Sequence, residues 1–441
     1  MKKAMVFGAG VSGLGGKQLL EKMGYEVILV DDKSAISSKD AMNMLEGLDF
    51  FIKSPGVPYT ELVIEAKKKN IEVIDEIELC YHYMLECKSN AKIIAVTGTN
   101  GKTTTTTKIT ELLNYAGYKA RYAGNIGVSL GSLLSSDEKL DYIVLELSSF
   151  QLENVKKFKP FISMIINLTP DHLARYKDEK EYYDTKFNIC KEQDKSEYFI
   201  FNTDCKEIVE RKDMIPASLV SITKTDNRKC DYQVIDGKLC YHGEEILECS
   251  KLSLKGQHNL ENILFIVATA KLCNITNEKL QGFLYHTNPL EHRMEIVMDY
   301  GHIRFINDSK ATNIDSSKFA IEAYDKCVLI CGGYDKGLEW TPLIDLINSH
   351  VSEVYFIGDI AQELNSRLKK TSFNPDKIHM LHDVRNTLLD IKERFDKNDN
   401  ITVLFSPATS SYDQFKNFEE RGRVYKELVR DIFGRWEFWK R

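Results

Sequence analysis

The stretch "VTGTNGKTTTTTK", from Val96 to Lys108, places a lysine and five consecutive threonines after a glycine turn. It follows the β-branched run "IIAVT" and precedes a helix-length segment, which is the context of a phosphate-binding loop. In such a loop the backbone N–H groups face the anion, Lys102 neutralises it and the Thr103 hydroxyl reaches Mg²⁺. The first glycine of the usual G-x-x-x-x-G-K-[ST] pattern would fall at Val96, so we interpret the loop as a shorter variant. The alternative is an ordinary helix start.

Thr103 is the predicted metal ligand among the five threonines, whereas residues 105–107 are also typical of a helix surface. The predicted ATP contacts of the loop are Gly98, Thr99, Asn100, Gly101, Lys102, Thr103, Thr104 and Thr105.

Further polar residues follow two other apolar runs. "DYIVLELSSFQ" places Glu146 near the carboxyl end of a buried strand, where parallel sheets present ligands. A carboxylate there commonly holds the metal of a nucleotide, and the alternative is a cap on the next helix. Asp171 and His172 follow "ISMIINL" at another strand exit. Lys186 lies on a highly charged amphipathic helix, so the pattern by itself predicts only a solvated lysine.

Composition excludes several classes of protein. The chain has 441 residues, 43% of them hydrophobic, and a net charge of −6 without a long basic stripe, so we expect no nucleic-acid partner. Its ten cysteines form no C-x-x-C pair, which argues against a zinc cage or a disulfide framework. No run reaches the ~18 apolar residues of a membrane span, and the first apolar run breaks at Gly8, too early for a signal peptide. We therefore expect a cytoplasmic protein without a membrane partner.

Short apolar runs alternate with helix-length amphipathic segments almost throughout, which is typical of α/β layers. Polar joints at residues 85–92 and 286–293 divide the chain. Hairpins are predicted around Asp236–Gly237 and at Tyr300–Gly301. The fold class is therefore α/β with three domains: a Rossmann-like N-terminal domain (1–90), a central P-loop ATPase-type domain with a mostly parallel sheet and a small antiparallel part (91–288), and a C-terminal Rossmann-like α/β domain (289–441).

The first domain carries a dinucleotide-type fingerprint. "AMVFGAGVSGLGG" reads as a strand, then Gly8-x-Gly10-x-x-Gly13, then a helix, and Asp31 and Asp32 end the next strand. Glycines at this spacing let backbone approach a diphosphate at a helix N-terminus. The pattern fits NAD, another nucleotide diphosphate such as a UDP-sugar, or a glycine turn used only for packing. Gly56 in "IKSPGV" supplies a second turn against which a ligand could lie.

Motifs distributed over essentially the whole chain resemble the ATP-dependent Mur ligases of peptidoglycan synthesis. The shared motifs are "GTNGKTT", "NIG", "LELSSFQLE", "DHLARY", "GQHNLEN", "EHRME", "NDSKATN", "GGYDKG" and "SPATSSYDQFKNFEERG". The last of these, with "NDSKATN" and "SPG", is similar to members that add D-glutamate, and the diamino-acid-selecting "DNPR" is absent. One departure is Ala174, where the family often has an aspartate in its "DHLDR" block.

The resemblance implies that the first domain binds the UDP of UDP-N-acetylmuramoyl-L-alanine rather than NAD, the central domain ATP and the C-terminal domain D-glutamate. It also implies that Lys186 carries a CO₂-derived carbamate. The implied substrate contacts are Val11, Ser12, Asp31, Asp32, Gly56, Asn125 and Ser148 for the UDP substrate, Asn262, Arg293, Asp308 and Lys310 for ATP, and Thr312, Lys336, Ser411 and Phe418 for D-glutamate.

The implied reaction transfers the γ-phosphoryl of ATP to the alanyl carboxylate, and the amine of D-glutamate then attacks the acyl phosphate. Thr103 and Glu146 would hold one Mg²⁺, and His172 and carbamylated Lys186 a second. Closure of the C-terminal domain about a joint near Pro289 is expected, as is a monomer. The alternatives are an NAD-dependent oxidoreductase, a nucleotide-dependent switch, and a Mur-type or folylpolyglutamate-synthetase-like ligase for another amino acid.

Overall fold

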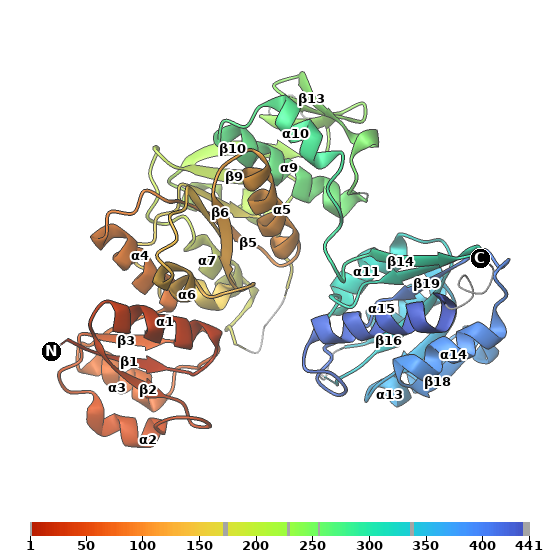
Figure 1. The fold of residues 1–441 in the computed structure, drawn as a ribbon, viewed down its shortest axis with the longest axis horizontal. Coiled ribbons are helices and arrows are strands. Elements are labelled where there is room, and N and C mark those ends of the chain that lie inside the picture. The colour runs from red at the N-terminus through yellow and green to blue at the C-terminus, as the bar shows by residue number, and fades with distance from the viewer. Residues whose placement is uncertain (1, 171–174, 227–229, 255, 336–338, 435–441) are drawn as a thin grey trace. The chain divides into compact units, whose positions relative to one another are not determined.

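A computed structural model describes residues 2–170, 175–226, 230–254, 256–335 and 339–434. The chain divides into two compact units, Met1–Thr287 and Asn288–Arg441, each built from α-helices and mostly parallel sheets (Figure 1). The predicted α/β class is confirmed, whereas the three domain boundaries stay a prediction.

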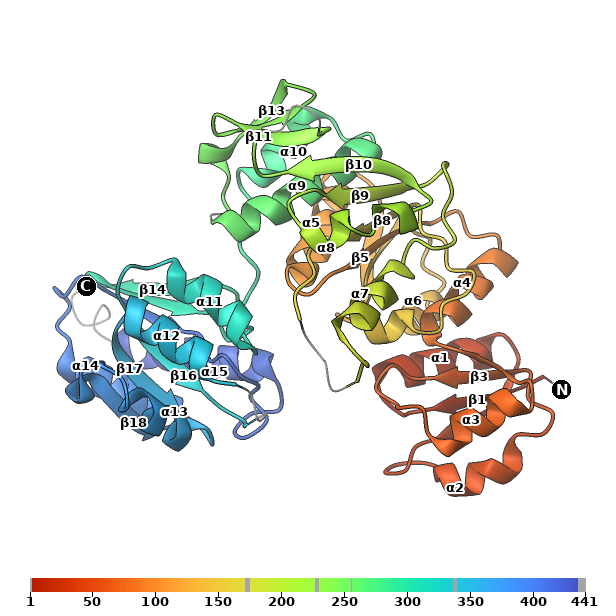
Figure 2. The ribbon, with the colours of Figure 1, turned by 180° about the vertical axis from the view of Figure 1, so that it is seen from behind.

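The first unit begins with a parallel four-stranded sheet in the order β2-β1-β3-β4. Ala4 and Val6 pack under α1 and α4, and Met5 and Phe7 pack under α2 and α3, because successive side chains of a strand point to opposite faces. Helices therefore cover both faces (Figures 1 and 2). The elements are β1 (Lys3–Phe7), α1 (Val11–Lys22), β2 (Glu26–Val30), α2 (Ser38–Ala41), η1 (Met42–Met44), β3 (Phe50–Lys53), α3 (Glu61–Lys68), β4 (Glu72–Ile74) and α4 (Glu76–Glu86).

The second sheet of this unit has nine strands in the order β13-β12-β11-β10-β9-β8-β5-β7-β6. Pairing is parallel from β6 to β11 and antiparallel from β11 to β13, as predicted. The strands are β5 (Lys92–Thr97), β6 (Ala120–Gly124), β7 (Tyr142–Glu146), β8 (Ile162–Ile165), β9 (Tyr198–Asn202), β10 (Ser218–Thr223), β11 (Tyr232–Ile235), β12 (Lys238–Tyr241) and β13 (Glu244–Glu248). The predicted hairpin is confirmed, because Asp236 and Gly237 join β11 to β12 with φ of 47° and 73°.

Helices α5 and α9 pack against this sheet and against each other. The suggestion that residues 105–107 form helix surface is therefore wrong for Thr105 and Thr106, which are fully buried. The helices of this part are α5 (Lys102–Tyr115), α6 (Leu130–Ser135), η2 (Ser149–Leu152), α7 (Glu179–Phe187), α8 (Lys206–Val209), η3 (Lys212–Met214), η4 (Cys249–Lys251), α9 (Gln257–Leu272) and α10 (Asn277–Leu284).

The two sheets of the first unit are joined by direct contact between α1 and α6. A Cβ on Gly131 would lie 2.4 Å from the Gly15 carbonyl oxygen, so the two helix backbones touch. Glu76 accepts a hydrogen bond from the Gly131 N–H (2.7 Å), and Glu78 accepts three from the N–H groups of residues 156–158 (2.8–3.1 Å). One apolar core extends across the contact, which explains why residues 1–287 form a single unit.

The second unit holds a six-stranded sheet in the order β14-β15-β19-β16-β17-β18, parallel except for β14. The predicted hairpin is confirmed, although its turn lies at Gly301–His302, one residue later than predicted; Gly301 has a φ of 63°. Helices α11 to α13 pack on one face and α14 and α15 on the other. The elements are β14 (Glu295–Tyr300), β15 (Ile303–Asn307), α11 (Ile314–Glu322), β16 (Cys327–Gly332), α12 (Thr341–His350), β17 (Val351–Ile357), α13 (Ala361–Leu368), η5 (Pro375–Lys377), β18 (Ile378–His382), α14 (Val384–Arg394), β19 (Ile401–Phe405) and α15 (Phe418–Gly434).

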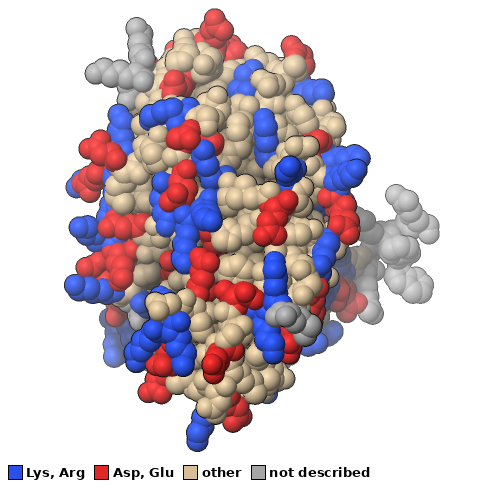
Figure 3. Space-filling view, turned by 90° about the vertical axis from the view of Figure 1, so that its left-hand side faces the viewer, with Lys and Arg blue, Asp and Glu red and all other residues tan. Residues whose placement is uncertain are grey.

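Basic and acidic side chains are interspersed over the face drawn in Figure 3. Within the described ranges, no helix combines the length and apolarity needed to cross a bilayer.

Candidate active site

The phosphate loop leads from β5 to α5 through two glycines with positive φ, Gly98 at 145° and Gly101 at 83°. A Cβ at Gly98 would lie 3.1 Å from the Ile166 nitrogen, and one at Gly101 would lie 2.4 Å from Asn262 Oδ1. Glycine alone allows this backbone conformation and this approach. Helix α5 begins at Lys102 directly after this turn, and the N–H groups at the amino end of a helix stabilise an anion.

The exit of β8 holds the loop in place. Asn167 accepts hydrogen bonds from the Thr99 N–H at its carbonyl (3.0 Å) and from the Asn100 N–H at its side chain (2.8 Å). Asn167 is absent from the predicted contacts, although it lies two residues after the end of a buried strand, at the same edge of the sheet as Glu146. That position could have identified it.

Lys102 extends over the loop and donates to two of its carbonyl oxygens at 2.9 and 2.8 Å. Thr105 donates to Asn262 Oδ1 at 3.3 Å, which brings α9 to the start of α5. The buried Thr104 hydroxyl has no hydrogen-bond partner among the described atoms. The structure thus brings the predicted loop residues and Asn262 together.

Glu146 ends β7 beside the phosphate loop, with Val96 of β5 as its partner in register. The side chain is 2% exposed. Its Oε1 accepts a hydrogen bond from Asn125 Nδ2 (2.9 Å), and its Oε2 has no partner within the described part of the chain. A buried carboxylate oxygen with coordination capacity fits Mg²⁺, which prefers hard oxygen ligands. Ser148, two residues further on, caps the amino end of η2: its hydroxyl accepts a hydrogen bond from the Gln151 N–H, and the Gln151 side chain accepts one from the Ser148 N–H.

Lys186 lies at the phosphate loop, which its sequence context does not indicate. The side chain is 2% exposed, and Nζ donates to the Gly98 carbonyl oxygen at 3.0 Å. Nζ also lies 4.7 Å from the centre of the Tyr182 ring. The prediction of a solvated lysine from the pattern alone is therefore wrong, because the face of α7 that carries Lys186 packs against the edge of the sheet that carries Gly98.

The glycine fingerprint between β1 and α1 forms a tight strand-to-helix turn. A Cβ on Gly13 would lie 1.8 Å from the Gly8 carbonyl oxygen, and Gly8 has a φ of 106°. Gly56 has open space at its Cβ position, and Val11 is 65% exposed. These features leave backbone accessible to a ligand at the amino end of α1.

The two acidic residues after β2 stabilise their own loops. Asp31 accepts hydrogen bonds from the N–H groups of Ala9 and Lys33 (both 3.0 Å) and from both the N–H and hydroxyl of Ser34. These bonds, that of Ala9 foremost, hold the pKa of Asp31 below its usual range. Asp32 accepts from the N–H of Ser38 at 2.6 Å. Asp31 thus ties the glycine turn to the end of β2.

The second unit places Asp308 directly after β15, 4% exposed. Its carboxylate accepts hydrogen bonds from the Ser406 hydroxyl (2.8 Å) and the Met294 N–H (3.3 Å). Burial raises its pKa to about 7, and the charge of Arg293 opposes that shift. Asp308 is therefore a buried group at the carboxyl edge of the sheet.

Arg421 connects the loops that carry the other predicted residues of this unit. It is 1% exposed and donates to the carbonyl oxygens of Ser309 (2.8 Å) and Thr409 (3.0 Å). The Ser309 hydroxyl donates to the Phe418 carbonyl (2.9 Å), and Lys310 Nζ lies 5.3 Å from the Phe418 ring centre. Ser411 is buried near this edge and Thr312 lies on the same loop as Lys310. Asp171, His172 and Lys336 lie outside the described residues.

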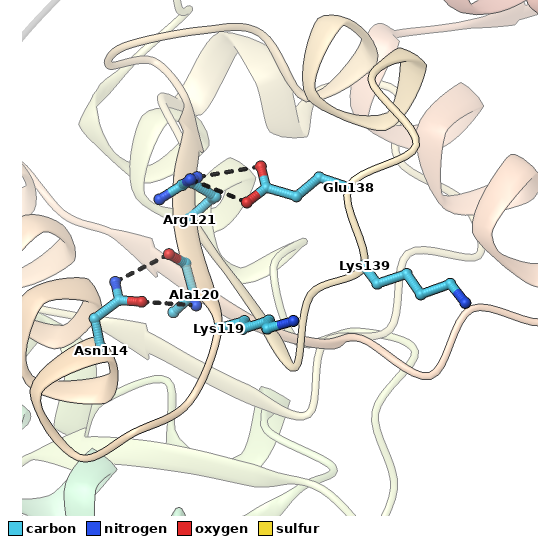
Figure 4. Close-up of a pocket in the computed structure, with 6 residues that line it drawn as sticks. All are labelled: Asn114, Lys119, Ala120, Arg121, Glu138 and Lys139. Carbon is cyan, nitrogen blue, oxygen red and sulfur yellow. Dashed lines mark hydrogen bonds and ion pairs between the residues drawn. The ribbon is translucent and has the colours of Figure 1, made fainter.

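Two further features are separate from these residues. Glu291, His292 and Glu295 have ligand-type atoms within 4.8 Å of one another, but Lys426 Nζ makes ion pairs with both carboxylates. A hollow of about 400 Å³ lies at the amino end of β6, opposite the phosphate loop, where Arg121 pairs with Glu138 at 3.0 Å (Figure 4). None of the predicted site residues lines it.

Known proteins resemble this chain over its whole length. The protein-family model of the Mur ligase middle domain matches residues 96–270 of the sequence. The UDP-N-acetylmuramoylalanine–D-glutamate ligase of Fusobacterium nucleatum subsp. nucleatum is 55% identical over 434 residues, which covers 98% of this chain and 100% of that protein. The protein of the same name from Caldanaerobacter subterraneus subsp. tengcongensis is 36% identical over 450 residues, 98% of both chains.

Among solved structures, MurF from Acinetobacter baumannii has a TM-score of 0.61 at 16% identity, with 92% of this chain and 90% of that chain covered. The UDP-N-acetylmuramate–alanine ligase of Thermotoga maritima has a TM-score of 0.59 at 17% identity, with 98% and 100% covered. These likenesses concern the fold.

Proposed function

This chain belongs to the Mur ligase family, among the UDP-N-acetylmuramoylalanine–D-glutamate ligases, and from this premise we propose that it uses ATP to join D-glutamate to UDP-N-acetylmuramoyl-L-alanine. The products are the lengthened UDP-linked peptide precursor, ADP and phosphate. The observation that carries the proposal is the convergence of Lys102, Glu146 and Lys186 on one phosphate loop.

The reaction requires activation of a carboxylate, which repels nucleophiles and has a poor leaving group. Transfer of the γ-phosphoryl of ATP to the alanyl carboxylate gives an acyl phosphate, from which phosphate leaves readily. The amine of D-glutamate then attacks the acyl carbon, and the tetrahedral intermediate collapses to an amide. Positioning and charge neutralisation account for most catalysis of phosphoryl transfer, and a cradle of backbone N–H groups with Lys102 suits both tasks.

The metal-binding residues are assigned by motif and by position. Thr103 and Glu146 would hold one Mg²⁺, while His172 and the carbamate of Lys186 would hold a second. Bound there, Mg²⁺ would supply neutralisation of the phosphate oxygens and orientation of the carboxylate. Carbamylation joins the neutral Lys186 amine to CO₂ with loss of a proton, which turns a buried cation into an oxygen ligand. The step needs the neutral amine of a buried lysine, and Lys186 is 2% exposed.

The remaining residues are assigned to the three substrates. Val11, Ser12 and Gly56 contact the UDP moiety through open backbone, and Asp31 and Asp32 shape that pocket. Asn125 and Ser148 contact the sugar-peptide part, beside Glu146. Asn262, Arg293, Asp308 and Lys310 contact ATP, and Thr312, Lys336, Ser411 and the backbone of Phe418 contact D-glutamate. The protein acts as a cytoplasmic monomer.

The test is phosphate release from ATP with UDP-N-acetylmuramoyl-L-alanine and a panel of D- and L-amino acids. Only D-glutamate should support full turnover, and ¹⁸O placed in the alanyl carboxylate should appear in the released phosphate. Full turnover with another amino acid would assign the chain to a sister activity, and phosphate without ¹⁸O would exclude the acyl phosphate.

The carbamate has a separate test. Lys186→Ala should abolish turnover, and the intact wild-type protein should carry the added mass of CO₂ at Lys186. Normal activity of Lys186→Ala would contradict the assignment.

A further inference from the structure

A buried ion cluster, formed by Lys53, Glu153 and Arg175, lies where the first sheet of unit one meets the second. Lys53 is fully buried, and the side chains of Glu153 and Arg175 are 11% and 22% exposed. Arg175 donates to both oxygens of Glu153, from Nε and from Nη2, each at 2.9 Å. Lys53 Nζ lies 3.5 Å from Glu153 Oε2. One carboxylate therefore joins cations from two different parts of the fold.

On the first-domain side, the cluster holds the turn proposed to contact the UDP substrate. Lys53 ends β3, and its ammonium group donates to the Val57 carbonyl oxygen across the turn at 3.0 Å. The next residue, Ser54, donates to the Gly8 carbonyl oxygen at 3.1 Å and so ties this turn to the glycine loop. The centre of the Tyr59 ring lies 5.1 Å from Lys53 Nζ, and the Tyr59 hydroxyl donates to Asn154 Oδ1 at 2.8 Å.

On the other side, Arg175 and the segment 150–153, to which Glu153 belongs, contact the approach to α7 and its carboxyl end. Arg175 lies just before this helix and stacks on Phe150, with its guanidinium carbon 4.3 Å from the ring centre. Asn188, which caps the carboxyl end of α7, donates to the Leu152 carbonyl oxygen at 2.9 Å. The segment 150–153 thus contacts the approach to α7 and its end. Between these two anchors lies Lys186, whose Nζ donates to the phosphate loop.

We propose that Glu153 is a positioning residue that couples the UDP-substrate turn to the phosphoryl-transfer site, through Lys53 on one side and Arg175 and α7 on the other. The inference rests on the proposed ligase function. Binding of the UDP substrate would fix the position of the Ser54–Val57 turn, and the ion cluster would transmit that constraint to α7 and hence to Lys186. A displacement of about 1 Å at a reacting group costs up to about 100-fold in rate, so a small shift of α7 is sufficient.

The obvious alternative is a purely structural cluster, in which a buried cation is neutralised and nothing else depends on it. Removing one member would then lower stability but leave the kinetic constants of the folded protein unchanged. The two cases therefore predict different kcat and KM values for the folded variants, whereas both predict a lower melting temperature.

The experiment measures kcat and the KM of each substrate in the full chain for Glu153→Gln, Lys53→Met and the double variant. Values are normalised to the folded fraction from circular dichroism. Glu153→Gln should lower kcat about 10- to 100-fold. Lys53→Met should raise the KM for the UDP substrate about tenfold and leave the KM for ATP within about twofold, because it releases only the substrate turn. The double variant should fall short of the product of the single effects, as expected for residues in contact.

Asp194→Asn is the matched control, since it breaks an ion pair of the same unit on the surface, with Lys159 at 2.8 Å. Its kinetic constants should stay within about twofold of the wild type. If Glu153→Gln does not fold, Lys53→Met decides the matter, because it keeps the Arg175–Glu153 pair. The proposal is overturned if the folded variants match the wild type in kcat and in the KM for the UDP substrate, or if the two effects multiply independently. A folded wild type without ligase turnover would instead refute the proposed function.

Discussion

Gly131→Ala tests the backbone contact that joins the two sheets of the first unit. The new Cβ would lie 2.4 Å from the Gly15 carbonyl oxygen and 2.6 Å from its carbonyl carbon. Both atoms belong to the backbone, so α1 and α6 must separate by at least about 0.6 Å to reach 3.0 Å, the shortest distance that real side chains show. Overpacking of this kind costs about 1–3 kcal/mol.

Alanine also favours helix over glycine by about 1 kcal/mol, so the expected net loss is up to about 2 kcal/mol. A loss of about 2 kcal/mol corresponds to a fall in Tm of roughly 4–6 °C for a unit of this size. Gly16→Ala, one residue after Gly15 on α1, is the matched control. Its Cβ would make ordinary contacts at 3.7–3.9 Å with Ile52, Glu76 and Leu79, so the helix preference should raise Tm by roughly 1–3 °C.

The assay is thermal unfolding of both variants and the wild type under identical conditions, followed by urea unfolding. Opposite signs for the two substitutions are the expected result. If Gly131→Ala were as stable as Gly16→Ala, the close approach of α1 and α6 would be wrong. Separation of the helices should also raise the KM for the UDP substrate more than the KM for ATP. In the proposed function the UDP substrate contacts loops of both sheets of the first unit, whereas ATP contacts loops of only the second of them.

Glu146→Gln should lower kcat at least about 100-fold. The Tm should stay unchanged or rise, because the substitution removes a buried charge and can keep the hydrogen bond from Asn125. A large fall in Tm would contradict the metal-ligand role. Lys336→Ala should raise the KM for D-glutamate far more than that for ATP, and equal effects in a kinetic titration would refute the assignment. Burial raises the pKa of Asp75 from 3.8 to about 7. The protonated carboxyl therefore favours the folded state, and its ionisation favours the unfolded state. The stabilisation by the protonated form is complete below about pH 4 and is lost as the pH rises through 7. Asp75→Asn should therefore gain roughly 2–3 kcal/mol relative to the wild type between pH 5 and pH 8 in urea unfolding, and a pH-independent difference would show that this carboxyl does not titrate as the structure indicates.

Several features could be predicted because they depend on short stretches of chain. The phosphate loop combines an apolar run, a glycine turn and a helix start, and each part specifies its own conformation locally. Glu146 was identifiable because a polar residue at the end of a buried run marks the carboxyl edge of a parallel sheet. Asp236–Gly237 predicted a hairpin for the same reason, since its turn type follows from two residues.

Other features could not be predicted from local pattern. The polar face of α7 is typical of a solvated helix, and Lys186 is buried only because α7 packs against the edge that carries Gly98. Thr105 and Thr106 lie in a polar run, yet both are buried, and Thr105 donates to Asn262 of α9. Asp31 has the spacing of a ribose-binding carboxylate, but the Ala9 N–H already occupies one of its oxygens. In each case a residue distant in sequence changes the environment of the side chain.

The amino-acid sequence by itself determined the α/β class, the phosphate loop and the order of the motifs, because hydrophobic period and glycine position act over a few residues. The tertiary structure alone decided which polar groups meet: Lys186 with the loop, Glu78 with residues 156–158, and Glu153 with Lys53 and Arg175. These contacts join segments from 22 to 100 residues apart. They depend on strand order and helix packing, which no short segment specifies.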